Sequence, residues 1–296
     1  MVIADRSSDP GTPGAAGNQT DHDHADRRHS EVDDHHQDHP ALTTQPTDGE
    51  MEIVGRLRQA SNQTFLVRIT RPGSELRGVY KPIKGERPLW DFPEGTLGFR
   101  EVAAYRVSRL AGFDVVPVTV LADGPFGPGS LQIWVDSEAD EVDRLVDLVS
   151  VDDVPESGWF PIVEGYAADD SPIVVMHADD NRLRNLAVFD ALINNADRKG
   201  GHILASRGRV FGVDHGICFH TENKLRTLLW GWSGDRLTAE ELGRIRTVAD
   251  QAVDLLADLL SEEEIEALML RAEGLMISGR LPHPHNDWHT IPWPPF

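Results

Sequence analysis

Apolar and polar residues alternate with a period of two in several short stretches, which is the pattern of half-buried strands. Strands are expected at residues 65–70, 77–82, 115–121, 131–135, 202–205 and 209–213. Turn residues separate neighbouring stretches, namely Pro72-Gly73, the Gly/Pro-rich residues 123–129 and Arg207-Gly208. The pattern therefore predicts strands that are joined in pairs by short turns.

Elsewhere the apolar positions recur with the period of a helix. Helices are expected at residues 96–110, 141–149, 178–195, 238–260 and 261–276. The last two begin with capping-box patterns, Thr238 with Glu241 and Ser261 with Glu264, and Thr96 is the expected N-cap of the first. Strands that are followed by helices predict an α+β fold.

Composition and pattern together divide the chain into four segments. They are a disordered acidic, His-rich tail (1–50), a strand-rich N-lobe (51–137), a helical C-lobe (138–280) and an irregular Pro/Trp-rich tail (281–296). The lobes are expected to meet near residues 135–139, and a cleft between lobes is where small ligands usually bind.

The first fifty residues differ from the rest in composition. They hold 3 basic and 11 acidic residues and six of the 13 histidines, with almost no large apolar side chains. Such a segment buries too little surface to offset the entropy of ordering it, so it is expected to be a solvated, disordered tail. The Asp/His run from His22 to His39 leaves transition-metal binding open as an alternative.

Charge and composition exclude several classes of function. The formal net charge of −21 argues against a general nucleic-acid binder, which needs a basic surface. The longest apolar stretches, such as 115–122, reach about eight residues, far short of the ~18 of a membrane-spanning helix. No secretory signal is readable, and one cysteine, Cys218, cannot form an internal disulfide. A cytoplasmic protein without membrane insertion is expected.

Lysine is scarce, since the 28 basic residues include only Lys81, Lys84, Lys199 and Lys224. A lysine that persists in such a chain is a candidate for a role that arginine does not fill. Two acidic residues, Asp197 and Asp214, lie in a stretch that is predicted to form loops and short strands. Phosphoryl transfer needs two such carboxylates, one to orient or deprotonate the attacking hydroxyl and one to hold a metal ion. Spacing by itself does not establish this role, because many loops contain two aspartates.

These residues resemble a known family. Asp197-Arg198-x-x-x-His202 followed by Asp214-His215-Gly216 is similar to the catalytic loop and metal-binding motif of the phosphatidylinositol 3- and 4-kinase superfamily. The resemblance extends upstream to Val79-Tyr80-Lys81-Pro82, Arg100 to Tyr105 and Phe113 to Pro117, and covers about residues 51–233. It is closest to kinase-like proteins of high-GC actinobacteria. The fold it implies is the two-lobed protein-kinase-like fold with the nucleotide cleft between the lobes.

The resemblance implies roles for individual residues. Lys81 would bind the α- and β-phosphates of ATP and Glu101 would hold Lys81, although an exposed strand lysine and a solvated helix acid are the alternatives. Asp197 would be the catalytic carboxylate and Asp214 the metal ligand. The remaining nucleotide-binding positions are a phosphate-covering loop and a hinge strand that meets adenine: Ser61, Asn62 and Thr64, then Gln132, Ile133, Trp134 and Val135.

Two residues beside the motif are expected to be structural. Arg198 would hold the catalytic loop in place, and Asp190, on the apolar face of its helix, would clamp the same loop, because an unpaired charge there would be costly. His202 stands where the family has an asparagine that ligates magnesium. Imidazole is a softer ligand that suits manganese or zinc better than magnesium. His202 is thus a second candidate metal ligand, for Mg²⁺ or Mn²⁺, unless it only packs at a strand start.

The phosphate acceptor is open: a protein, a lipid or a small molecule. Residues 217–230 correspond to the segment that reads the acceptor in lipid kinases, and they offer only Lys224 and Arg226, beside Glu222. An acidic protein is repelled by anionic membranes, which counts against an inositol lipid. The sequence therefore predicts an ATP- and metal-dependent phosphotransferase, with a nucleotide-binding pseudokinase as the alternative. Metal storage through the tail and His283, His285 and His289 is a weaker third interpretation.

Overall fold

The computed structural model describes residues 47, 49–57, 62–87, 89, 92, 96–167, 169–285 and 289–296. All of these belong to the unit formed by residues 46–296. The disorder expected for residues 1–50 therefore falls almost wholly outside the described residues. The α+β class is confirmed, because antiparallel sheets and helices both contribute to this unit.

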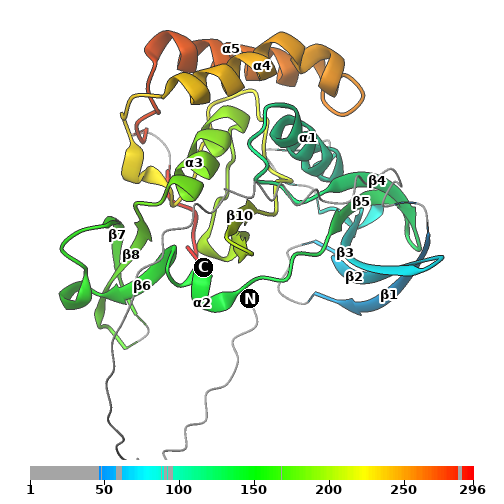
Figure 1. Cartoon of the computed structure of the whole chain (residues 1–296), viewed down its shortest axis with the longest axis horizontal. Helices are drawn as coiled ribbons and strands as arrows, with labels where there is room; N and C mark the ends of the chain where they lie inside the picture. Colours follow the sequence, from blue (N-terminus) through cyan, green and yellow to red (C-terminus); the bar gives the residue numbers. More distant parts are fainter. Residues whose placement is uncertain are drawn as a thin grey trace, which may run out of the picture. The chain divides into compact units, whose positions relative to one another are not determined.

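A five-stranded antiparallel sheet has the strand order β1-β2-β3-β5-β4 (Figure 1). Its strands are β1 (Glu50–Arg56), β2 (Phe65–Arg71), β3 (Ser74–Pro82), β4 (Thr119–Gly124) and β5 (Gly127–Ile133). The β2–β3 pair was predicted with its turn. The β4–β5 hairpin is tighter than expected, because both strands continue into the Gly/Pro-rich stretch and only Pro125 and Phe126 form the turn.

The period-two pattern determines on which face of this sheet each side chain lies. Phe65, Val67 and Ile69 of β2 are buried in a small apolar cluster. Tyr80 of β3 lies in the same cluster and is fully buried. Successive side chains of a strand point to opposite faces, so Lys81 lies on the other face.

The helices form the larger core of the unit. They are α1 (Leu97–Leu110), α2 (Ala139–Val142), α3 (Asn181–Ile193), α4 (Ala239–Leu256) and α5 (Glu262–Ser278). Both predicted capping boxes are present, at the starts of α4 and α5. Apolar side chains of α1, α3, α4 and α5 belong to one cluster, and α4 and α5 lie side by side above α1 and α3 in Figure 1. None of the described helices is long and apolar enough to span a membrane.

Thr96 occupies the predicted N-cap position of α1, but it makes no capping hydrogen bond through its side chain. Its backbone is left-handed (φ 63°). Glu86 supplies the cap instead, since its carboxylate accepts hydrogen bonds from the N–H groups of Leu97 (3.1 Å) and Gly98 (2.7 Å). A carboxylate at this position also interacts favourably with the positive end of the helix dipole. The first turn of α1 is thereby tied to the segment that follows β3.

The helix predicted at residues 141–149 is also wrong. Only the single turn α2 is helical there, and the chain continues into a three-stranded antiparallel sheet of order β6-β8-β7. Its strands are β6 (Val146–Ser150), β7 (Trp159–Tyr166) and β8 (Pro172–Ala178). In Figure 1 this sheet lies on the opposite side of α3 from the five-stranded sheet. The segment predicted to be mostly helical therefore contributes a second sheet.

The remaining regular elements are short. The hairpin predicted around Arg207-Gly208 is present as β9 (Ile203–Ser206) and β10 (Arg209–Gly212), and both turn residues have positive φ. Single 3-10 turns are η1 (Ile83–Gly85), η2 (Val151–Asp153), η3 (Gly200–His202) and η4 (Trp230–Trp232).

His177 joins the three-stranded sheet to the helical core. Its side chain is fully buried and packs against the rings of Phe160 and Trp232, which also contact each other. Nδ1 is 2.9 Å from the carbonyl oxygen of Ala178, and Nε2 accepts a hydrogen bond from the N–H of Gly231 (3.0 Å). Burial lowers the pKa of His177 to about 4, so the ring is neutral near pH 7.

This depressed pKa makes the fold sensitive to acid. The unfolded chain takes up a proton near pH 6.5, whereas the folded chain does so only near pH 4, so stability falls as the pH drops between these values. The loss from His177 by itself is expected to approach about 3 kcal/mol. His177→Gln keeps an acceptor for Gly231 but does not titrate. Denaturant unfolding at pH 7, 5.5 and 4 should show a smaller loss for His177→Gln than for the wild type. Equal losses would contradict the assignment.

Candidate active site

Lys81 lies at the centre of a cluster of charged side chains. Its Nζ atom donates to Glu101 Oε1 (2.5 Å) on α1 and to Asp214 Oδ1 (2.8 Å) after β10. The Lys81 side chain is 24% exposed, Glu101 3% and Asp214 53%. The contact expected between Lys81 and Glu101 is therefore present. The exposed carboxylate of Asp214 gives the cluster a face open to solvent.

The electrostatics of the cluster favour its charged forms. Burial by itself would lower the pKa of the Lys81 ammonium, but the charges of Asp214 and Glu101 outweigh burial and raise that pKa. The nearby Lys81 ammonium in turn lowers the pKa of Asp214 well below its usual range. An ammonium and a carboxylate that remain charged near neutral pH are suited to bind phosphate and a cation, respectively.

The position of Glu101 is fixed from two directions. Its second oxygen, Oε2, accepts from the N–H of His215 (3.1 Å), so Glu101 links Lys81 to the residue that follows Asp214. On the same helix Arg100 donates to the carbonyl oxygen of Cys218 (2.9 Å) and pairs with Glu264 of α5. Helix α1 is thereby held against the segment that carries Asp214.

The backbone around Asp214 requires an unusual conformation. Asp214 is left-handed (φ 61°), a region that aspartate tolerates better than most residues. A side chain on Gly216 would come within 3.3 Å of Leu97 Cβ and 3.7 Å of Glu101 Oε1. The glycine therefore allows this segment to approach α1, which explains the Asp-x-Gly pattern in terms of packing.

Arg198 and Asp190, each predicted to hold the loop in place, form a buried ion pair with each other. Both side chains have no exposed surface, and Arg198 Nε and Nη2 donate to the two carboxylate oxygens of Asp190 at 2.9 Å. The guanidinium also donates to the carbonyl oxygens of His202 (3.1 Å) and Val213 (2.9 Å). Its Nη2 atom lies 2.7 Å from Nε2 of His215. One side chain thus holds the loop of Asp197 and the segment of Asp214 together.

His202 connects Asp197 to Asp214. Its Nδ1 atom is 2.8 Å from the carbonyl oxygen of Asp197, and its Nε2 atom is 3.4 Å from Oδ2 of Asp214. The Asp197 side chain is 21% exposed and forms an ion pair with Lys199, with 3.2 Å between Oδ2 and Nζ. The imidazole of His202 therefore links the backbone of Asp197 to the carboxylate of Asp214.

The protonation of His202 indicates what its Nε2 atom can bind. A carbonyl oxygen accepts only, so Nδ1 carries the hydrogen. Burial lowers the pKa of His202, so the ring is neutral and Nε2 presents a lone pair to the Asp214 carboxylate. Two acceptors that face each other fit a cation between them. The residues present therefore fit a divalent metal with one nitrogen and one oxygen ligand from the protein.

Within the described ranges, no group of three or more His, Cys, Asp and Glu side chains is arranged to hold a metal ion. His283, His285 and His289 lie in those ranges and form no such group with other described residues. The run from His22 to His39 lies outside the described residues. A metal at His202 and Asp214 would thus need further oxygen ligands from water or from nucleotide phosphates.

The chain has a relative in Mycobacterium tuberculosis. It is 48% identical over 261 residues to Protein Rv2133c of that organism, and the match covers 84% of this chain and 93% of that protein. The chain belongs to the family of Protein Rv2133c. No family model matches the sequence. The name of that relative states no activity.

The predicted hinge residues of this family member are mostly engaged within the sheet. Gln132 pairs with both neighbouring strands, and its side chain donates to Thr119 (2.9 Å). The N–H groups of Ile133 and Trp134 donate to the carbonyl oxygens of Val118 and Arg77. Val135 is different, because its N–H donates to no other described residue. Of the four positions, Val135 is thus the best placed to donate to a ligand.

The predicted phosphate-covering loop is described only in part. Ser61 lies outside the described residues. Asn62 Oδ1 accepts from the N–H of Arg87 (3.0 Å), and Thr64 is buried with its hydroxyl donating to the carbonyl oxygen of Asn62 (3.3 Å). The Asn62 side chain therefore ties the loop to the segment after β3, whereas the Thr64 hydroxyl bonds within the loop.

Two residues of the site were missed by the sequence analysis. Lys199 pairs with Asp197, and the scarcity of lysine that singles out Lys81 applies equally to Lys199. Asn195 donates to Asp190 Oδ1 (2.9 Å) and accepts from the N–H of Asp197 (3.0 Å). It therefore connects helix α3 to the loop that carries Asp197. No sequence signal marks Asn195, because its two partners are set by the fold.

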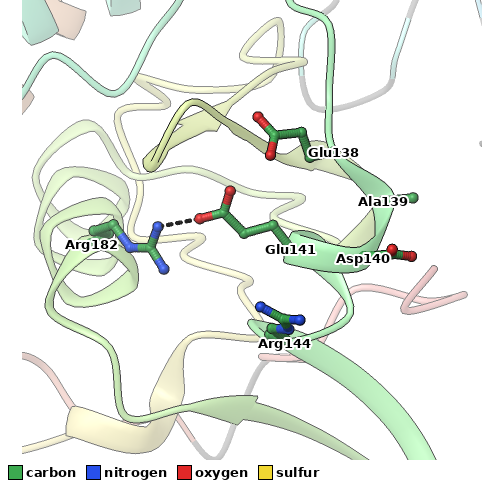
Figure 2. Close-up of a pocket in the computed structure, with 6 residues that line it drawn as sticks. All are labelled: Glu138, Ala139, Asp140, Glu141, Arg144 and Arg182. Atoms are coloured by element: carbon green, nitrogen blue, oxygen red, sulfur yellow. Dashed lines mark hydrogen bonds and ion pairs between the residues drawn. The ribbon is translucent and has the colours of Figure 1, made fainter. Parts of the chain in front are cut away.

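A polar pocket lies beside α2 and is separate from the charged cluster. It is lined by Glu138, Ala139, Asp140, Glu141, Arg144 and Arg182 (Figure 2). Glu141 pairs with Arg182 of α3 (2.5 Å), and Glu138 accepts from the N–H of Arg207 (2.8 Å). These carboxylates join α2 to α3 and to the β9–β10 turn, which is a structural role.

The Arg198–Asp190 pair is expected to dominate the stability of this region. Arg198→Met removes one partner and leaves the Asp190 carboxylate buried and unpaired, which should lower the free energy of unfolding by about 3–5 kcal/mol. Arg109→Met is the matched control, because Arg109 and Asp114 form an exposed pair (70% and 42%) whose loss should cost at most about 1 kcal/mol. Denaturant unfolding of both variants measures the difference. Equal losses would refute a central role for Arg198.

Proposed function

We propose that this protein is an ATP- and metal-dependent phosphotransferase that transfers the γ-phosphate to a hydroxyl group. The observation that carries the proposal is the three-way contact of Lys81 with Glu101 and Asp214, joined through His202 to the loop of Asp197. The resemblance to phosphatidylinositol 3- and 4-kinases supports the same roles. We also propose that the chain has the two-lobed kinase-like fold that this resemblance implies.

Each protein group has a separate task in the transfer. The Lys81 ammonium, held by Glu101, binds the α- and β-phosphates and neutralises part of their charge. The Oδ2 atom of Asp197 is paired with Lys199, which leaves Oδ1 to accept a proton. As the hydroxyl oxygen attacks the γ-phosphorus, its proton passes to Asp197, and the bond to the β,γ-bridging oxygen breaks to leave ADP.

The metal ligands follow from the facing acceptors described above. Asp214 Oδ2 and His202 Nε2 would hold one divalent cation, with phosphate and water oxygens completing its shell. A bound divalent cation supplies positive charge that stabilises the phosphates as charge shifts onto ADP. Lys81 orients Asp214 through Oδ1 and leaves Oδ2 toward His202.

The acceptor segment favours a substrate other than an anionic lipid. Lys224 is buried and pairs with Glu222, and Arg226 Nε donates to the carbonyl oxygen of Ala196 (2.7 Å). Both basic residues of this segment thus have partners within the protein. With a net charge of −21, such a surface has little attraction for anionic membranes. A hydroxyl group of a protein or a small molecule is the proposed acceptor.

Removal of the Asp197 carboxylate should separate catalysis from binding. Asp197→Asn is expected to lower kcat by about 10²- to 10⁴-fold, or roughly 3–5 kcal/mol of barrier, with the Kd for ATP nearly unchanged. Asp214→Asn should instead abolish metal-dependent ATP binding. Asp250→Asn, on the exposed face of α4, is the control. Transfer of label from γ-labelled ATP to a bacterial lysate and to phosphoinositide vesicles measures turnover, and calorimetry measures binding. Rates indifferent to both substitutions would refute the mechanism.

The metal preference should depend on His202. Because imidazole favours manganese over magnesium, His202→Asn is expected to raise the affinity for ATP with Mg²⁺ relative to Mn²⁺. Calorimetric titration of ATP with each metal gives the ratio of the two dissociation constants. A ratio that is the same in His202→Asn and the wild type would show that His202 does not ligate the metal.

A nucleotide-binding pseudokinase is the second candidate. The observation in its favour is His202 itself, which replaces an amide ligand by an imidazole at the proposed metal site. Tight ATP binding without transfer to any acceptor, in the wild type as in Asp197→Asn, would favour this function.

A further inference from the structure

The segment 289–296 lies against the loop that carries Asp197. The N–H of Gly200 donates to the carbonyl oxygen of Pro295 (2.8 Å). The carbonyl oxygen of Thr290 accepts from the N–H of Thr227 and from the indole of Trp230, both at 3.0 Å. Residues far apart in the sequence are thus joined beside the proposed catalytic residue.

The packing at Gly200 explains why a glycine is present there. A Cβ atom at this position would overlap the ring of Phe296, whereas a Cβ atom on Gly201 would meet nothing within 4 Å. Gly200 does not have a positive φ, so its backbone conformation is open to other residues. The missing side chain therefore serves the close approach of the Phe296 ring.

The loop has few other supports at this point. Arg198 is held by residues 226–228. Its N–H donates to the carbonyl oxygen of Arg226, and its own carbonyl oxygen accepts from the N–H of Leu228. From residue 199 to residue 201, the hydrogen bond from Gly200 to Pro295 is the only backbone bond that reaches another described segment. Lys199, the partner of Asp197, lies between these two attachments.

The segment 289–296 is rigid enough to hold the loop of Asp197 in place. Three of its residues between 292 and 295 are prolines, and proline restricts the backbone before docking, which lowers the entropy lost on docking. Pro292 and Pro295 are buried, Ile291 and Phe296 pack against the main core, and Trp293 is 75% exposed. The buried residues fix the segment to the helical core.

We propose that Pro295 and Phe296 are positioning residues for the catalytic loop. They hold Gly200, and through it Lys199 and the Asp197 carboxylate, in the geometry that phosphate transfer requires. The proposal rests on the function proposed above for Asp197. A displacement of about 1 Å in such a loop is enough to cost about 10²-fold in rate, while nucleotide binding at Lys81 and Asp214 is unaffected.

The test compares variants on the two sides of the contact. Phe296→Ala removes the ring, and Gly200→Ala pushes against it. Both are expected to lower kcat by at least tenfold with the KM for ATP within twofold of the wild type. The double variant should lose no more than the worse single variant, because both changes act on one contact. Trp293→Ala, on the exposed side of the same segment, is the control and should leave kcat unchanged.

Hydrogen exchange of the full-length protein without nucleotide provides a readout independent of turnover. Amides of residues 197–203 should exchange faster in Phe296→Ala and Gly200→Ala than in the wild type and Trp293→Ala, with α4 and α5 unchanged. If the wild type transfers no phosphate, the proposed function fails, and exchange still decides whether the segment holds the loop. Wild-type exchange and kcat in both Phe296→Ala and Gly200→Ala would overturn the proposal. Faster exchange throughout the protein would overturn it too, since it would show a general structural role.

Discussion

The fully buried ion pair between Arg198 and Asp190 is the constraint on which the site depends. A charge without exposed surface is stable only if its partners surround it, so every hydrogen bond of Arg198 fixes a neighbouring segment. Those segments are helix α3, the loop from Asp197 to His202 and the residues on both sides of Asp214. Gly212 belongs to the same arrangement, because a Cβ atom there would lie 2.7 Å from Arg198 Nη2.

A second link runs between the five-stranded sheet and this centre. Lys81 comes from β3, Glu101 from α1 and Asp214 from the segment after β10, and they meet only if α1 is held between sheet and helices. Arg100 holds α1 to α5, and Arg106 pairs with Asp258 beyond α4 (2.6 Å). The apolar side chains of α1 belong to the helical core and not to the core of the sheet. Glu101 is therefore positioned by the helical part of the unit, whereas Lys81 is positioned by the sheet.

Local signals predicted much of the fold but failed between residues 139 and 178. The capping boxes of α4 and α5 and the β9–β10 turn depend on residues within a few positions of one another, so the sequence displays them. The three strands β6, β7 and β8 are stabilised by pairing across the chain and by the burial of His177 against Trp232. Short apolar runs do not reveal such pairing, so residues 141–149 gave a helical pattern. The cap of α1 was missed for the same reason, because Glu86 is eleven residues from the helix start at Leu97.

The sequence by itself determined the residue types of the candidate site and their order: a scarce lysine, a helix glutamate, Asp197 and Asp214, with Arg198 and Asp190 as separate supports of the loop. Only the tertiary structure decided which atoms meet. It placed His202 between the two aspartates, paired Lys199 with Asp197, and brought Phe296 onto Gly200. The physical reason is that a side chain's chemistry is set by its type, whereas its partners, its burial and hence its protonation are set by segments that lie far away in the chain.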